Sequence, residues 1–357
     1  MFAPLIHILP LATIMRTRLM PVEGKIIIGI GQKVNPTDVV AEAIVGRKHL
    51  VIDIAQKLNV AQRDVPKFLR VKKGQQIAKN DVLAETPGLF GKEVPAPAAG
   101  TVVATGGGKI VIETGGAVFE LRAGIPGIVA QTIGGRGVVI RATGGVVQGV
   151  WGNGKLDFGT MHSLMETPDE IFDPGRIDVS LRGTILLGGH LESPKVLQNA
   201  VEMSVRGLIV PSINPALLQS ALQAPFPILV LEGFGRRPMN PSAYKLLSTN
   251  VKRDVSLNAE MPTRSNPSSR QEASVRPEVF IPLPVSQEPP EPRQVETFAP
   301  GQVVRVMFLS KPGRQGTILN LRPMATLPNG IQANAAEVRL ENGEQILSPL
   351  TNLEVVG

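Results

Sequence analysis

The chain of 357 residues contains no cysteine, one tryptophan and one tyrosine. The absence of cysteine excludes disulfide bonds, thiolate-bound zinc, cysteine-ligated iron–sulfur clusters and a catalytic thiol. It also makes a reducing cytoplasm the expected location. The few histidines are scattered and show no metal-ligand spacing: His7, His49, His162 and His190. With 37 glycines and 31 prolines, the composition predicts many turns and cores with few aromatic rings.

Two common enzyme motifs are also missing, because the chain has no Gly-x-Ser-x-Gly and no phosphate loop ending in Gly-Lys-Ser/Thr. We therefore expect a non-catalytic protein without cofactor or metal. The apolar run at the N-terminus is interrupted by Pro4 and Pro10 and ends at Arg16. It is shorter than the roughly 20 residues that span a bilayer. We interpret it as a first strand and expect no membrane insertion.

The net charge of +7 is concentrated in one segment. Between residues 47 and 79, nine basic residues stand against two acidic ones, so this window carries the whole excess. A local basic surface suits a polyanionic partner better than a diffuse excess does, although a solvated helix and loop is the simpler interpretation. The candidate contact residues in this segment are Arg47, Lys48, Lys57, Lys67, Arg70, Lys72 and Lys73.

A twelve-residue phrase occurs twice, as GQKVNPTDVVAE at residues 31–42 and GQQIAKNDVLAE at residues 74–85. Six of the twelve positions are identical. Short β-branched runs closed by glycines surround both copies, which predicts strands and turns. We expect residues 1–150 to form one β domain in which two interlocking hairpins cover each other's apolar faces. The helical spacing of VIDIAQKLNV predicts that the basic segment is a helical insertion over residues 47–73.

The segment VKKGQQIAKNDVLAE…KEVPAPAAGTVV resembles the barrel-sandwich hybrid domains that carry lipoyl or biotinyl groups. The residues matching the strand after the modified lysine are Val94, Ala96, Pro97, Gly100 and Val102. The resemblance covers residues 21–104 and implies the fold. Leu89 occupies the position of the family's lysine, so the resemblance implies no attached cofactor.

Residues 178–261 alternate strand-like runs with helices that open on a capping residue followed by proline, as in Ser193-Pro194, Asn214-Pro215 and Asn240-Pro241. Three such units predict a small parallel α/β layer. Residues 151–177 are interpreted as a connector. Residues 262–297 are rich in Pro, Ser, Gln and Glu, which predicts an extended linker whose apolar EVFIPLP segment could dock on a neighbouring domain.

Residues 298–357 begin with GQVVRVMFLSKPGRQGTILNLRP, in which valines alternate and Gly313 and Gly316 frame a turn. This pattern resembles the KOW motif of bacterial transcription elongation factors and ribosomal proteins, which implies an SH3-like barrel. The turn lacks the aromatic residue that many members have, so no stacking ring is expected there. The resemblance implies contact with RNA, ribosome, RNA polymerase or another protein, through Arg305, Lys311 and Arg314.

The C-terminal ends of the predicted parallel strands form a second candidate site, because ligands favour this edge of open α/β sheets. Its candidate anion-binding residues are His190, Ser193, Asn214, Arg236 and Arg237, beside Ser212 and Glu232. The layout resembles swivelling phosphohistidine domains, but proline follows Ser193 where that family has its histidine, so phosphotransfer is not implied. The alternative is a surface loop whose polar groups bind one another.

The sequence thus predicts a cytoplasmic multidomain protein that is mainly β, with a barrel-sandwich hybrid, one small α/β domain and an SH3-like barrel. Three functions are compatible with it. The first is a non-catalytic adaptor that binds RNA, the ribosome or RNA polymerase through a tethered C-terminal barrel. The second is a sensor or enzyme for anions or phosphorylated metabolites, and the third is a scaffold that forms homo-oligomers.

Overall fold

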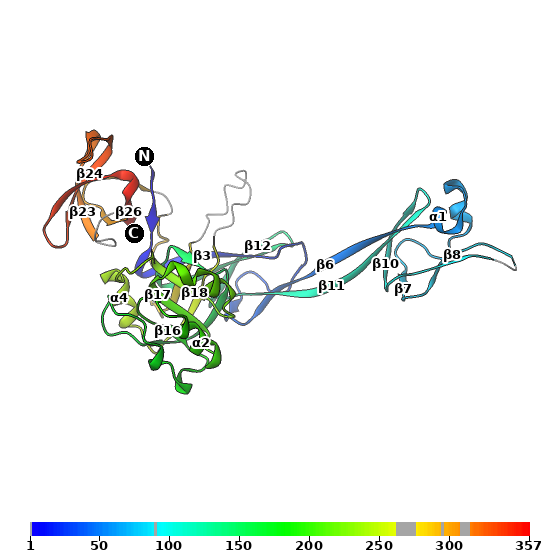
Figure 1. Ribbon diagram of the computed structural model, residues 1–357, viewed down its shortest axis with the longest axis horizontal. Helices are drawn as coiled ribbons and strands as arrows, with labels where there is room; N and C mark the ends of the chain where they lie inside the picture. Colours follow the sequence, from blue (N-terminus) through cyan, green and yellow to red (C-terminus); the bar gives the residue numbers. More distant parts are fainter. Residues whose placement is uncertain (1, 89–90, 262–275, 294–295, 308–314) are drawn as a thin grey trace.

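The computed structural model describes residues 2–88, 91–261, 276–293, 296–307 and 315–357. The protein is mainly β and contains several sheets, as the sequence predicts. Figure 1 shows a globular body with a small C-terminal β unit beside it. A long two-stranded ribbon leaves the body and carries a further small unit at its far end (Figure 1).

The body is organised around one sheet of eleven strands in the described chain. In spatial order these are β14 (Trp151–Gly152), β18 (Ile228–Phe234), β17 (Gly207–Ile213), β16 (Ile185–Leu187), β15 (Leu156–Ser163), β19 (Asp254–Asn258), β20 (Glu278–Pro282), β13 (Gly137–Gln148), β12 (Gly127–Ile133) and β5 (Lys33–Val34). The eleventh, β3 (Ile8–Leu19), lies off this path and pairs antiparallel with β13. The apolar N-terminus is therefore a strand of the body, as predicted.

One half of this sheet is parallel and carries helices on both faces. Strands β15 to β18 run parallel to one another. Helices α2 (Pro194–Glu202) and α3 (Leu218–Gln223) contribute to the core on one face, and α4 (Pro241–Ser248) contributes to the core on the other. The 3₁₀ turns η2 (Pro174–Arg176) and η3 (Val179–Leu181) precede β16, and η4 (Pro215–Leu217) precedes α3. The predicted parallel α/β layer is confirmed.

The predicted caps of this layer are also confirmed. The side chains of Ser193, Asn214 and Asn240 each accept a hydrogen bond from the backbone N–H two residues later, at 3.3, 3.0 and 2.9 Å. Each is followed by a proline in the first helical turn, where no backbone donor is required. Asn214 caps η4 rather than an α-helix, and α3 continues from that turn.

The boundaries of the layer differ from the predicted ones. Residues 156–163, predicted within a connector, form β15, which pairs with β16 on one side and β19 on the other. The EVFIPLP segment, predicted within a linker, supplies the buried strand β20 between β19 and β13. It completes the sheet instead of docking on it. Residues 262–275 and 294–295 of the predicted linker lie outside the described part of the chain.

The two copies of the repeated phrase lie in two separate hydrophobic cores. The first copy is buried in the body with β3, β12 and β13, whereas the second is buried in the unit at the far end of the ribbon. The corresponding buried residues are Val34 with Ile77, Val40 with Leu83, and Ala41 with Ala84. The prediction that the two hairpins interlock within one domain over residues 1–150 is therefore wrong.

Each copy nevertheless builds the same local structure. The Asp38 side chain accepts a hydrogen bond from the Asn35 N–H at 2.7 Å, and Asp81 accepts one from Ala78 at 2.7 Å. A short strand of each copy then pairs with a glycine on a neighbouring strand. The strand β5 pairs with Gly127 of β12, and β7 (Gln76–Ile77) pairs with Gly100 of β10 (Gly100–Gly106). The repeat therefore marks one structural unit used twice.

The ribbon consists of β6 (Val39–Asp53) and β11 (Lys109–Arg122), which pair antiparallel from the body to the far end. The short strand β4 (Lys25–Ile26) pairs with β6 near the body. We call residues 52–112 the distal domain. Besides β7 and β10 it contains α1 (Ile54–Leu58), the 3₁₀ helix η1 (Gln62–Lys67), β8 (Val82–Glu85) and β9 (Glu93–Pro95). Leu89, at the predicted hairpin tip between β8 and β9, lies outside the described residues.

The basic insertion is less helical than predicted. Residues 47–53 continue β6, because the β-branched Val51 and Ile52 pair with Val111 and Ile110 of β11. The α-helix begins only after Asp53, whose side chain accepts a hydrogen bond from the Gln56 N–H at 2.9 Å. The inserted unit is also larger than residues 47–73, because it includes the second repeat and its partner strands.

The C-terminal unit has its own core. Its strands are β22 (Val303–Val306), β23 (Gln315–Thr326), β24 (Gln332–Leu340), β25 (Gln345–Pro349) and β26 (Leu353–Val356), with the 3₁₀ turn η5 (Leu350–Asn352) before β26. The N-terminal segment completes this unit: β2 (Leu5–Ile6) pairs with β26, and β1 (Phe2–Ala3) pairs with β21 (Glu296–Thr297).

This unit is docked on the body and is not a free tethered domain. The Arg305 Nη1 of β22 lies 2.8 Å from the Glu232 Oε2 of β18, and both side chains are buried. Gln315 Nε2 donates to Asn240 Oδ1 at 3.1 Å. The Ile8 N–H donates to the carbonyl of Gly357 at 3.2 Å, which joins the first long strand of the body to the chain end. The prediction of a C-terminal barrel joined to the body only by a tether is therefore wrong.

No helix in the described part of the chain is long and apolar enough to cross a membrane.

Candidate functional site

The basic residues predicted to contact a polyanion gather on the ribbon and the distal domain. Arg47 and Lys48 lie on β6, Lys57 on α1 and Lys67 on η1. Arg70, Lys72 and Lys73 follow in the loop before β7, and all seven side chains are exposed. The structure thus places these seven side chains on a unit held away from the body (Figure 1).

Some of these cations are already in ion pairs. Arg47 Nη1 lies 3.1 Å from Glu113 Oε1, Lys67 Nζ lies 2.8 Å from Asp64 Oδ1, and Arg70 pairs with Glu85. Lys48, Lys57, Lys72 and Lys73 have no ion pair with any residue that the structure describes. Exposed pairs contribute little to stability, so all seven cations remain accessible to a phosphate backbone.

Of the predicted contacts of the C-terminal unit, Arg305 is not on a free surface. Arg305 is 1% exposed and lies between two buried carboxylates, Glu232 of the body and Glu354 of β26. Burial alone would lower the pKa of Arg305, but these two carboxylates raise it, so the guanidinium stays charged. Arg305 therefore joins the C-terminal unit to the body and cannot contact a partner. Lys311 and Arg314 lie outside the described residues.

Most of the residues predicted as an anion site at the edge of the α/β layer make hydrogen bonds within the protein. His190 is buried, and its Nδ1 lies 2.8 Å from the Ser212 hydroxyl, which also accepts a hydrogen bond from the Arg237 N–H at 3.0 Å. Burial lowers the pKa of His190. Arg237 Nε donates to the carbonyl of Phe234 at 3.2 Å.

The remaining members of this set are a helix cap or a surface residue. Ser193 and Asn214 are caps, as described above, and Arg236 is exposed. Glu232, expected beside them, pairs with Arg305. His190 and Arg237 come together around Ser212. Neither residue lines either of the two cavities described below. This favours the alternative of a surface whose polar groups bind one another.

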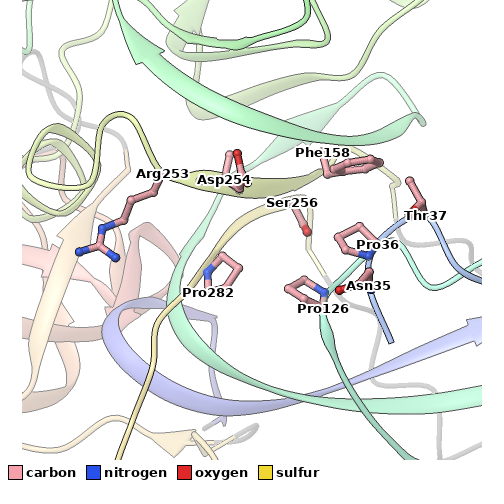
Figure 2. Close-up of a pocket in the computed structure, with 10 residues that line it drawn as sticks. Asn35, Pro36, Thr37, Pro126, Phe158, Arg253, Asp254, Ser256 and Pro282 are labelled. Carbon is pink, nitrogen blue, oxygen red and sulfur yellow. The ribbon is translucent and has the colours of Figure 1, made fainter. Parts of the chain in front are cut away.

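Sequence reasoning missed a cavity of about 450 Å³ between the body's first repeat and the main sheet. Figure 2 shows it between the turn at Asn35 and Pro36 and the strands β15, β19 and β20. Phe158 lines it from β15, and Ser256 from β19. The only signal in the sequence was the alternation of polar and apolar residues in β19, DVSLN, which predicts one polar strand face. The sequence does not indicate which segment covers that face.

Ser256 is the most unusual residue of this cavity. It is 4% exposed, and its hydroxyl has no hydrogen-bond partner among the residues that the structure describes. Buried hydroxyls normally find a partner. Ser256 also lines a second cavity of about 20 Å³, which adjoins the ion pair of Arg16 and Glu278. Ser256 therefore contributes to the wall of the larger cavity a hydroxyl that no described residue uses.

No model of a known protein family matches the chain, and no curated protein sequence matches it. Among the described residues, no group of three or more His, Cys, Asp or Glu side chains could hold a metal ion.

Proposed function

We propose that the protein is a non-catalytic binding protein that contacts RNA through its distal domain. The observation that supports this proposal is the position of the exposed basic residues of the ribbon and distal domain, which are held away from the body on two paired strands. The resemblance of residues 298–357 to KOW modules favours RNA over other polyanions. The proposal moves the contact from the C-terminal unit to the distal domain, because Arg305 is buried at the docking interface.

The proposal assigns different tasks to the remaining parts. The C-terminal unit is taken to be an SH3-like barrel and the two repeat units to be related to barrel-sandwich hybrids, as their sequences predict. The body and the docked barrel form the base, and the ribbon presents the basic unit. A phosphate backbone would release counterions as it binds these lysines and arginines, so affinity would depend strongly on salt.

The test is binding of a single-stranded RNA to the whole chain over a salt series, read by fluorescence anisotropy. The variant changes Lys57, Lys72 and Lys73 to glutamine. If each lysine neutralises one phosphate, the slope of log affinity against log salt should fall in magnitude by about 2. The matched control changes three exposed lysines of the body, Lys195, Lys245 and Lys252, and should keep the native slope. Absence of binding by the native chain at low salt, or equal slopes for both variants, refutes the proposal.

A scaffold that forms homo-oligomers is a second candidate. Ile44 and Val118 face one another across the ribbon and are 47% and 67% exposed. An exposed apolar pair on the face of a two-stranded ribbon is a site against which the ribbon of a second copy could pack. Sedimentation of the native chain and of Val118→Lys distinguishes the two candidates: only the scaffold predicts an oligomer that the substitution dissociates.

A further inference from the structure

We propose that the 450 Å³ cavity binds an uncharged heteroaromatic ring of the nucleobase kind. The cavity lies in the body, on the sheet face turned toward the first repeat. Its volume is within the range of small-molecule sites, which are concave, mostly apolar and equipped with a few polar groups. This site is separate from the basic surface of the distal domain.

The walls of the cavity suit a flat ring. Phe158 presents its ring to the cavity, and Arg206 lies over a face of the same ring, with its guanidinium carbon 4.3 Å from the ring centroid. Arg206 does not line the cavity, whereas Phe158 does, so we take the ring surface that borders the cavity to be the one on which a ligand stacks. The rings of Pro36, Pro126 and Pro282 line the rest of the space in Figure 2. An aromatic face between apolar rings binds a planar partner through stacking and dispersion.

The ligand needs a hydrogen-bonding edge. The buried Ser256 hydroxyl can donate and accept, and it has no partner in the described protein. Asn35 lines the same cavity with a side-chain amide that offers both donors and an acceptor. In Figure 2 Ser256 and Asn35 reach into the space below the Phe158 ring. A nucleobase edge carries alternating donors and acceptors and matches such a pair.

The ligand ring should carry no negative charge. Of the two charged lining residues, Arg253 extends away from the other side chains in Figure 2. Asp254 accepts a hydrogen bond from the Thr160 hydroxyl at 2.6 Å. An anionic group stacked on Phe158 would thus lose water and would meet the Asp254 carboxylate without a cation pointing toward it, which is unfavourable. The geometry therefore favours a neutral base or nucleoside over an anion.

The test measures binding of adenosine, uridine and adenosine monophosphate to the whole chain by titration calorimetry. We expect at least one nucleoside to bind, and we expect the monophosphate to bind no more tightly than adenosine. Ser256→Ala should weaken nucleoside binding about tenfold, the value of one hydrogen bond. Phe158→Leu should weaken it by at least about fivefold through lost stacking. Ser220→Ala, at an exposed serine of α3, is the matched control and should bind as the native chain does.

Ser256→Ala should weaken nucleoside binding without lowering the stability of the fold. Because this hydroxyl has no partner, its removal should leave the unfolding temperature unchanged or higher. The lysine variant of the distal domain should keep nucleoside binding, and Ser256→Ala should keep RNA binding. The RNA proposal and the nucleobase proposal can therefore be refuted separately. The inference is overturned if neither nucleoside binds, or if Ser256→Ala and Phe158→Leu bind a nucleoside as well as the control.

Discussion

Replacing Arg305 with methionine should show how much the buried ion pair between the C-terminal unit and the body contributes to the free energy of unfolding. Arg305 lies between Glu232, at 2.8 Å, and Glu354, at 2.5 Å. Without Arg305, Glu354 would keep its ion pair with Arg276 at 2.5 Å. Among the described residues, Glu232 would keep only the hydrogen bond from the Asn240 N–H at 3.1 Å, and burial already raises its pKa. The main penalty therefore comes from one uncompensated buried carboxylate.

Breaking a buried ion pair from one side costs about 3–5 kcal/mol. With Glu354 still paired, we expect Arg305→Met to lower the free energy of unfolding by about 3 kcal/mol, the lower end of that range. Replacing both members, in Arg305→Met with Glu232→Leu, should recover most of this loss, because apolar residues of similar size can replace a buried pair at little cost.

Urea unfolding followed by the fluorescence of Trp151 measures this change. Trp151 is the only tryptophan and lies in the body, with its ring centroid 6.3 Å from that of Phe234. Arg322→Met, which removes an exposed arginine from the same C-terminal unit, is the control and should unfold like the native chain. A loss below about 1 kcal/mol for Arg305→Met, or a double variant no more stable than the single one, contradicts the role assigned to this pair.

Two further predictions concern pH and the repeated units. Burial lowers the pKa of His7 below its usual value of 6.5, so on acidification the unfolded chain takes up a proton at this histidine more readily than the folded chain does. The free energy of unfolding should therefore fall as the pH drops below about 6.5. In urea unfolding between about pH 7.5 and 5.5, His7→Gln should show a smaller fall than the native chain. A Cβ at Gly100 would lie 2.2 Å from the Glu113 carbonyl, and one at Gly127 would lie 2.3 Å from the Arg141 carbonyl. Gly100→Ala should therefore destabilise only the distal domain, which would show as faster amide hydrogen exchange there and an unchanged urea midpoint for Trp151 fluorescence. Gly127→Ala should lower that midpoint. If both variants changed the midpoint equally, the two cores would not be independent.

The parts of the fold that could be predicted from the sequence are those set by local chemistry. The caps Ser193, Asn214 and Asn240 act within three residues of themselves, so the helical segments began where expected. The strand character of the N-terminus and of residues 303–306 likewise followed from alternation and β-branched residues.

The parts that could not be predicted depend on contacts between distant segments. Residues 278–282 look like linker because prolines surround them, yet they are buried when β13 and β19 pair on either side. Arg305 looks like a surface cation of a β unit, and only Glu232, which lies 73 residues earlier, makes it a buried one. The cavity at Ser256 has the same origin, because its walls come from the first repeat and from strands far along the chain.

The ribbon shows how one sequence pattern can serve two cores. In β6 the buried residues near the body are Val40, Ala41 and Ala43, with an irregularity in the pairing to β11 beside Val40, whereas Ile52 is buried at the distal end. Odd and even positions of a regular strand point to opposite faces, so beyond this irregularity the ribbon buries the face of Ala41 and Ala43 at the body and the face of Ile52 in the distal domain. The same inversion occurs in β11, where Leu121 is buried near the body and Ile110 in the distal domain.

This inversion explains the exposed apolar residues of the ribbon. Val51 is 63% exposed because it lies on the face that the body buries, but beyond the body. Val118 and Ile44 lie on the face that the distal domain buries, but before it. A slip of one residue between β6 and β11 would turn apolar residues out of one core or the other. The two cores therefore fix the register jointly, and the register in turn fixes which way the basic surface of the distal domain faces.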